Sequence, residues 1–164
     1  VCLLTRVATY ALLKVQTELN KQALGLLVYD CYRPQMAVND FILWSQNPED
    51  QTTKNLFYPN IDKRNLFKLN YIARRSGHTR GSTVDLTLVD LKKNQILDMG
   101  TPFDFLDPLS HPNNRDITAA QFKNRMLLRS LMIKFGFMPI KTEWWHFTLK
   151  NEPYKNTYFN FLVE

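Results

Sequence analysis

The sequence predicts an α+β fold: a single domain in which a small, mainly antiparallel sheet packs with helices. The chain has 164 residues, which suits one domain, so residues 1–164 are expected to form one unit. Hydrophobic residues make up 45% of it and charged residues 22%, as in ordinary globular proteins. Helical and strand-like segments are segregated, and the strand-like segments come in hairpin-like pairs, which favours α+β over a parallel α/β sheet.

The first half of the chain predicts helix, strand and helix, followed by a long connection. Apolar residues recur at helical spacing over 3–21, and 26–29 is a short apolar run that suits a buried strand. Pro34 suits the first turn of a helix over 35–46. Residues 47–70 carry prolines and little periodicity, so we expect an irregular connection, which in a small domain is more often functional than idle.

The second half predicts two strands in a hairpin, a helix and a last strand. Residues 83–89 alternate as a strand does, and 95–99 can pair with them across a short polar turn. A loop over 100–117 leads to a helix over 118–135, for which the threonine at its start is a suitable N-cap. Aromatic and β-branched residues over 144–149 predict the last strand.

Charge and hydropathy exclude two classes of partner. The net charge is +6, but the basic residues are spread along the chain instead of forming one stripe, so we expect a solvated basic surface and no nucleic-acid partner. No window approaches the roughly 18 consecutive apolar residues of a membrane span. The two cysteines, Cys2 and Cys31, lack the spacing of a metal knuckle; we expect free thiols, with a bridge between them as the alternative.

Two of the three histidines have unusual neighbours in the sequence, and these two suit a metal site. His78 lies in a glycine-containing turn, Asp85 follows in the strand that this turn enters, and His146 begins the last strand. A catalytic zinc takes three such ligands and leaves a fourth position for water. An inward-facing Asp85 needs a partner, because an unpaired buried carboxylate is very unfavourable. The spacing leaves two alternatives open, a metal site and a buried ion pair.

Glu143 is the natural general base beside such a metal, because it stands three residues before His146. On a regular strand, residues three apart point to opposite faces. Glu143 can therefore face the metal only from an irregular strand entrance or a bulge. Arg33 ends the first strand and could stabilise an oxyanion; a structural pair with Asp30 is the alternative.

Asp104 and His111 lie in the loop over 100–117 and are weaker candidates. An aspartate in a loop usually caps a turn, and this is the alternative to a binding role for Asp104. His111 stands between a serine and a proline and is expected to be a surface loop residue.

Taken together, the motifs resemble one known family. The chain contains D-x-Y-R-P, then S-x-H-x-x-G-x-x-x-D, and far downstream E-x-x-H. This pattern resembles the zinc D-alanyl-D-alanine dipeptidases, the VanX-type enzymes of the M15 peptidase group. The segments 47–49, 58–62, 99–105 and 152–154 also look like family segments in the family's order, so the resemblance covers nearly the whole chain.

The resemblance implies one Zn²⁺ per chain, in a zinc site at the sheet with His78, Asp85 and His146 as its ligands. It implies Glu143 as the catalytic base and Arg33 as the residue that stabilises the transition state. The expected reaction is hydrolysis of the dipeptide D-Ala-D-Ala to two D-alanines.

The resemblance also implies contacts around the substrate. Asp30 matches an acidic residue that orients Arg33, while Ser76 and Asp104 match positions near the bound dipeptide. A carboxylate of Asp104 on the substrate ammonium would explain a dipeptidase, because it leaves no room for a longer chain at that end. The alternatives are a D,D- or L,D-carboxypeptidase or endopeptidase acting on peptidoglycan stem peptides, and a non-catalytic D-Ala-binding module.

Two departures from the family pattern stand out. The family's N-terminal segment is expected to be absent or trimmed, and Cys31 stands where a small residue is expected, so its oxidation or metal capture could disturb the site. The expected partner is a small dipeptide. A bacterial cytoplasmic or periplasmic location, and a role in vancomycin resistance, cell-wall recycling or nutrition, are all compatible with the sequence.

Overall fold

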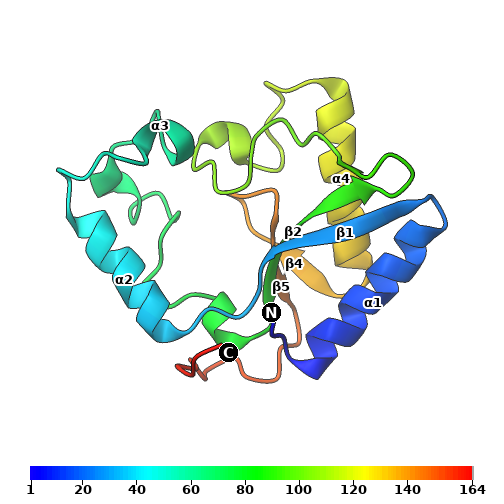
Figure 1. The fold of residues 1–164 in the computed structure, drawn as a ribbon, viewed down its shortest axis with the longest axis horizontal. Coiled ribbons are helices and arrows are strands. Elements are labelled where there is room, and N and C mark those ends of the chain that lie inside the picture. Colours follow the sequence, from blue (N-terminus) through cyan, green and yellow to red (C-terminus); the bar gives the residue numbers. More distant parts are fainter. Residues whose placement is uncertain (164) are drawn as a thin grey trace.

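The computed structural model describes residues 1–163. Its central element is a five-stranded antiparallel sheet (Figure 1). The strand order is β1-β2-β5-β4, and the short β3 pairs with β2 as well. The strands are β1 (Leu24–Asp30), β2 (Thr83–Asp90), β3 (Gln95–Ile96), β4 (Phe137–Pro139) and β5 (His146–Leu149). The predicted single α+β domain with an antiparallel sheet is confirmed.

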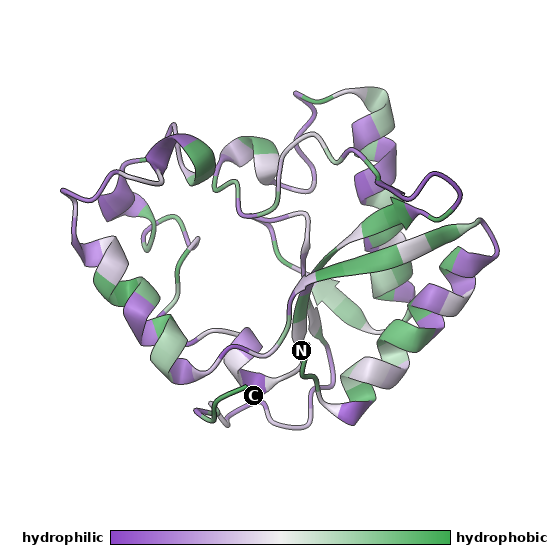
Figure 2. Ribbon diagram, viewed as in Figure 1, coloured by the Kyte–Doolittle hydropathy of each residue, from purple (hydrophilic) through white to green (hydrophobic). Residues whose placement is uncertain are grey.

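Two long helices pack side by side against the sheet, and two shorter helices do not cover it. The helices are α1 (Arg6–Asn20), α2 (Gln35–Gln46), α3 (Lys54–Phe57) and α4 (Ala119–Lys134). α1 contacts β1, and α4 contacts β4 and β2, so both cover the sheet. Thr118 and Gln121 form a capping box at the start of α4, which confirms the predicted N-cap. Figure 2 shows β1 and β2 largely hydrophobic, whereas much of the loop chain is hydrophilic.

β2 is the central strand and explains how a charged side chain enters the core. Its first six residues are all buried, because β1 and β5 pair with it on either side. Asp85 lies within this buried run, opposite His146 of β5 and, through an irregular register, opposite Asp30 of β1. The register shifts between Val28 and Asp30, so the end of β1 departs from the regular ladder.

The connection after α2 is irregular, as predicted, yet it has a small core of its own. It contains α3 and two short 3-10 turns, η1 (Lys63–Asn65) and, at its end, η2 (His78–Arg80). Its buried apolar residues, together with Leu106 from the loop after β3, form a cluster separate from the sheet's core: Tyr58, Ile61, Leu66, Ile72 and Leu106. This second core stabilises the connection, which lines one side of the main cavity.

Three details of the elements differ from the sequence-based expectations. β4 was not predicted, because a three-residue strand leaves too short a pattern to recognise. β5 begins at His146 instead of at residue 144, and β3 ends at Ile96 instead of at residue 99. Among the described residues, no helix is long and apolar enough to cross a membrane.

The expectation of free thiols was wrong: Cys2 and Cys31 form a disulfide. Cys2 and Cys31 are 29 positions apart, and the residues between them contain α1 and the whole of β1, two elements that pack against each other. The antiparallel return of the chain brings Cys2 back beside the end of β1, which spacing alone could not reveal.

Candidate active site

Three side chains from three segments meet at one point beside the sheet. His78 comes from η2, Asp85 from β2 and His146 from the start of β5. His78 Nε2 lies 3.2 Å from Asp85 Oδ2, and His146 Nδ1 lies 3.0 Å from Asp85 Oδ1. The two ring nitrogens are 3.3 Å apart, and one ligand atom from each residue lies within 4.8 Å of the others. The structure thus brings together the three residues that the sequence singled out as a metal site.

The donor set fits a zinc ion. Two imidazole nitrogens and a carboxylate oxygen are zinc ligands in catalytic sites. Within the described chain, Asp85 Oδ1 is buried and accepts no hydrogen bond of good geometry, although His146 is close. His78 Nδ1 lies 2.6 Å from the carbonyl oxygen of Cys31. Because a carbonyl can only accept, Nδ1 carries the proton, which leaves Nε2 of the neutral ring free to bind a metal.

The charges of the cluster stabilise one another. Burial raises the pKa of Asp85, but the two neighbouring histidines outweigh burial and hold this pKa below its ordinary value. Burial lowers the pKa of His78, and the Asp85 carboxylate outweighs that effect and raises it. The buried ion pair is therefore the arrangement of the metal-free cluster, so the two alternatives left by the sequence involve the same three side chains.

Glu143 lies beside the cluster in an irregular segment, as its position three residues before His146 required. Its Oε2 is 3.6 Å from His146 Nδ1, and the side chain is 11% exposed. Residues 141–145 precede the first residue of β5, so the alternation of a regular strand does not apply to Glu143. Burial raises the pKa of Glu143 to about 8. This carboxyl can therefore hold a proton near neutral pH.

Arg33 combines the two interpretations that the sequence left open. Its Nη2 and Nε donate hydrogen bonds to Asp30 Oδ2 over 2.6 and 3.1 Å, so the structural pair is present. Arg33 also lines the cavity that contains the histidine cluster. Burial lowers the pKa of Arg33, but Asp30 outweighs it and the pKa is raised, so the guanidinium stays charged.

The cluster opens into a cavity of about 680 Å³. Its polar lining consists largely of the predicted site residues: Arg33, Ser76, His78, Asp85, Asp104, Glu143 and His146. Its apolar lining comes mainly from α2 and the irregular connection: Ala37, Val38, Phe41, Trp44, Phe57, Ile72 and Leu106. The reactive groups and the apolar wall thus belong to different parts of the fold.

Asp104 and Ser76 both line the cavity, with different local roles. Asp104 adopts φ +59°, a left-handed conformation that is uncommon outside glycine. Burial, and then the charge of Asp85, raise the pKa of Asp104 to about 6. Ser76 Oγ accepts a hydrogen bond from the backbone N–H of His78 over 3.2 Å, so it shapes the turn that presents this histidine.

Sequence reasoning missed the apolar wall and the second role of Cys31. The aromatic residues of α2, Phe41 and Trp44, matched a helical face but gave no sign that this face lines the cavity. The Cys31 contact with His78 is made by the backbone, which leaves no trace in residue type. His111, expected at the surface, is partly buried, and its Nε2 lies 3.1 Å from the Tyr71 hydroxyl, outside the histidine cluster.

Comparison with known proteins identifies the family. The model of the peptidase M15 family, described as D-ala-D-ala dipeptidase, matches residues 1–164. A protein of Streptomyces coelicolor named D-alanyl-D-alanine dipeptidase is 47% identical over 97% of this chain and 79% of its own length. Proteins with the same name from Enterococcus faecalis and Escherichia coli are 43% and 37% identical, over 97% and 90% of this chain and 79% and 67% of their own.

These matches cover nearly all of the chain, including each element that contributes a side chain to the histidine cluster and its cavity. The chain therefore belongs to the peptidase M15 family of D-ala-D-ala dipeptidases.

Proposed function

We propose that this chain is a zinc-dependent dipeptidase that hydrolyses D-Ala-D-Ala to two molecules of D-alanine. The observation that carries the proposal is the meeting of His78, Asp85 and His146 at one point, with the buried carboxyl of Glu143 beside them in a cavity. The names of the family and of the similar proteins support the dipeptide as substrate.

His78, Asp85 and His146 would hold the metal ion. When bound, a zinc ion supplies a Lewis acid that polarises the peptide carbonyl and makes a water molecule easier to deprotonate. The chain contributes the fixed orientation of the ligands: the Cys31 carbonyl holds the His78 ring, and pairing of β2 with β5 sets Asp85 opposite His146.

Glu143 acts as the general base and then as the general acid. It accepts a proton from the attacking water and returns this proton to the amine that leaves. Its buried position suits both steps, because burial raises the pKa of a carboxyl towards neutral pH and a proton carrier works best when its pKa is near the working pH.

Arg33 stabilises the negative charge that develops on the carbonyl oxygen of the substrate. Its two hydrogen bonds to Asp30 Oδ2 hold the guanidinium at the cavity. One donor of this kind typically contributes about 3–4 kcal/mol to lowering the barrier. Asp30 is therefore a positioning residue for Arg33.

Asp104 binds the ammonium of the substrate, and Ser76 lies near the dipeptide on the turn of His78. Asp104 is a carboxylate in the lining of the same cavity, and a free amine is the group that it would pair with. This contact selects substrates with a free N-terminus.

A carboxypeptidase or endopeptidase acting on peptidoglycan stem peptides is the second candidate. The size of the cavity favours it, because about 680 Å³ is more than a dipeptide of two alanines needs. A binding module that does not cleave would need neither Glu143 nor Arg33 at the cavity.

Amino-acid release separates these candidates. Free alanine is detected with ninhydrin from D-Ala-D-Ala, L-Ala-L-Ala and N-acetyl-D-Ala-D-Ala, each on zinc-loaded and on chelated protein of measured metal content. We expect zinc-dependent release from D-Ala-D-Ala alone. Equal cleavage of the acetylated substrate would replace the dipeptidase with a carboxypeptidase. No release with about one zinc bound per chain would leave the binding module.

A further inference from the structure

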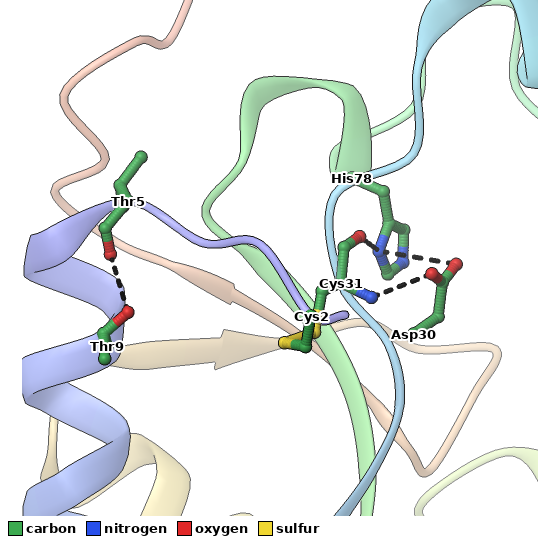
Figure 3. Close-up of a disulfide and its surroundings, with 6 residues drawn as sticks. All are labelled: Cys2, Thr5, Thr9, Asp30, Cys31 and His78. Atoms are coloured by element: carbon green, nitrogen blue, oxygen red, sulfur yellow. Dashed lines mark hydrogen bonds and ion pairs between the residues drawn. A yellow bond between two sulfur atoms is a disulfide. The ribbon is translucent and has the colours of Figure 1, made fainter. Parts of the chain in front are cut away.

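The disulfide between Cys2 and Cys31 lies near His78, one of the three metal-ligand candidates (Figure 3). Cys31 is 4% exposed and directly follows Asp30, the last residue of β1. Figure 3 draws Cys31 between the disulfide and the His78 ring, with its carbonyl directed at that ring. The disulfide therefore joins Cys2 to a residue that directly follows Asp30 and whose carbonyl contacts His78.

The backbone of Cys31 supports both of these groups. Its carbonyl oxygen accepts the hydrogen bond from His78 Nδ1 over 2.6 Å, which turns the opposite nitrogen, Nε2, towards Asp85. Its N–H donates to Asp30 Oδ1 over 2.8 Å, while Asp30 Oδ2 pairs with Arg33. A displacement of Cys31 would therefore disturb a metal ligand and the guanidinium together.

Sheet pairing does not hold Cys31 in place. The β1–β2 register shifts between Val28 and Asp30, and β1 ends at Asp30. Beyond that point the N-terminal segment replaces the ladder: Tyr32 N–H donates to the Leu3 carbonyl over 3.0 Å, and Thr5 N–H donates to the Gly81 carbonyl over 2.7 Å. The disulfide adds a covalent bond to these hydrogen bonds, and it restrains Cys31 directly.

We propose that the disulfide is a redox-dependent support of the metal site. In the oxidised protein it holds the Cys31 carbonyl at His78 Nδ1, and reduction weakens zinc binding. A dithiol reductant breaks the S–S bond by supplying two electrons and two protons; two thiols form, and the reductant becomes a disulfide. This inference rests on the zinc binding in the proposed function. Under this proposal, the form that binds zinc more strongly is the disulfide-bonded one, which persists in an oxidising compartment.

Zinc affinity measured without substrate tests the proposal. The dissociation constant is obtained by competition with a chromophoric chelator for three forms: oxidised wild type, wild type reduced with a phosphine and desalted, and Cys2→Ala/Cys31→Ala. The double variant also excludes metal capture by a free Cys31 thiol. We expect both altered forms to bind zinc about 10-fold to 100-fold more weakly, the range for loss of a group that orients a ligand.

Thr5→Ala is the matched control. Thr5 belongs to the same N-terminal segment: its Oγ1 lies 2.7 Å from Ser82 Oγ and accepts from the N–H of Ala8 at the start of α1. Its loss removes an N-cap and one attachment of the segment while the disulfide remains. We expect a lower melting temperature and an unchanged zinc dissociation constant.

The outcomes are separable. An unchanged zinc affinity in the folded double variant would overturn the proposal, as would an equal loss in Thr5→Ala, which would indicate general loosening. If the double variant does not fold by circular dichroism, the reduced wild type decides. If this form is unfolded too, the disulfide is a requirement of the whole fold and the proposal is wrong. Failure of the oxidised wild type to bind zinc would instead overturn the proposed function.

Discussion

The two sides of the cavity are built in different ways. The sheet half, which comprises α1, α4 and the five strands, packs around a core of seventeen buried apolar residues. It supplies two of the three metal-ligand candidates, Asp85 and His146, while His78 lies in η2, just before β2. The irregular half, residues 35–73, has a core of five buried residues, one of which, Leu106, comes from outside it, and supplies most of the apolar wall. The cavity thus lies between a side built on hydrogen-bonded strands and a side built from the helix α2 and irregular chain.

A buried lysine shows how the irregular half keeps its shape. Lys63 is 1% exposed, and its Nζ donates to the carbonyls of Asn47 and Asp50 over 2.8 and 2.9 Å. The same ammonium lies 4.0 Å from the ring centre of Trp44 in the cavity wall. Polar contacts to loop carbonyls thus take the place of a strand ladder. Under the proposed function, we expect the chemistry to depend on the sheet half and the fit of the substrate on the irregular half.

Glu143→Gln has the largest expected effect, and it tests the sheet half. The variant keeps the size of the side chain but cannot accept a proton. We expect kcat for D-Ala-D-Ala to fall about 100-fold to 10,000-fold, the usual contribution of a general base, with zinc content unchanged. Turnover and bound metal are measured on one sample. Glu49→Gln makes the same change on an exposed residue of the irregular half and is expected to leave kcat unaltered. Loss of zinc in Glu143→Gln would make Glu143 a metal ligand.

Leu88→Ala and Leu66→Ala compare the two cores directly. Both leucines are fully buried, Leu88 in β2 and Leu66 in the irregular half. We expect Leu88→Ala to lower the free energy of unfolding by about 3–5 kcal/mol and Leu66→Ala by about 2–3 kcal/mol, because the smaller core can collapse onto the cavity. Hydrogen exchange should show lost protection across the sheet in the first variant and within residues 47–73 in the second. Identical patterns would contradict the division into halves.

The pH dependence of stability sharpens the account of Glu143 in the metal-free protein. Burial raises its pKa from 4.5 to about 8. Between these values the unfolded chain releases the proton while the folded chain keeps it, so stability falls as pH rises through this window. We expect wild type to lose about 3 kcal/mol relative to Glu143→Gln between pH 5 and pH 8. Urea unfolding at both pH values measures this difference, and an equal change in the two proteins would show that Glu143 is ionised when buried.

Trp44→Ala has the smallest expected effect and tests the irregular half. Trp44 stacks on Phe41 with ring centres 5.1 Å apart, and both line the cavity. We expect KM to rise about 3-fold to 10-fold with kcat and zinc affinity nearly unchanged, the pattern of lost substrate binding. Leu43→Ala, on an exposed position of the same helix, is the control. A fall in kcat with constant KM would place this wall in the chemistry instead.

The sequence predicted the sheet half better than the irregular half, for physical reasons. A charged Asp85 between apolar neighbours must find a partner when buried, and periodicity marked α1 and α4. Residues 47–70 have no period, so nothing in them foretold the second core or the burial of Lys63. The Cys2–Cys31 pairing depends on how α1 and β1 fold back on each other, which is a property of the tertiary structure.

The left-handed backbone conformation of Asp104 sets the stability of the protein against its proposed selectivity for substrate. A side chain at φ +59° is less favourable than glycine by about 1 kcal/mol, so Asp104→Gly would relieve the backbone and remove the carboxylate that is proposed to hold the substrate amine. A library screened for heat resistance alone would therefore enrich glycine here and collect robust proteins that no longer distinguish a free dipeptide from a longer one. Selection for growth on the dipeptide would drive the same position back to aspartate.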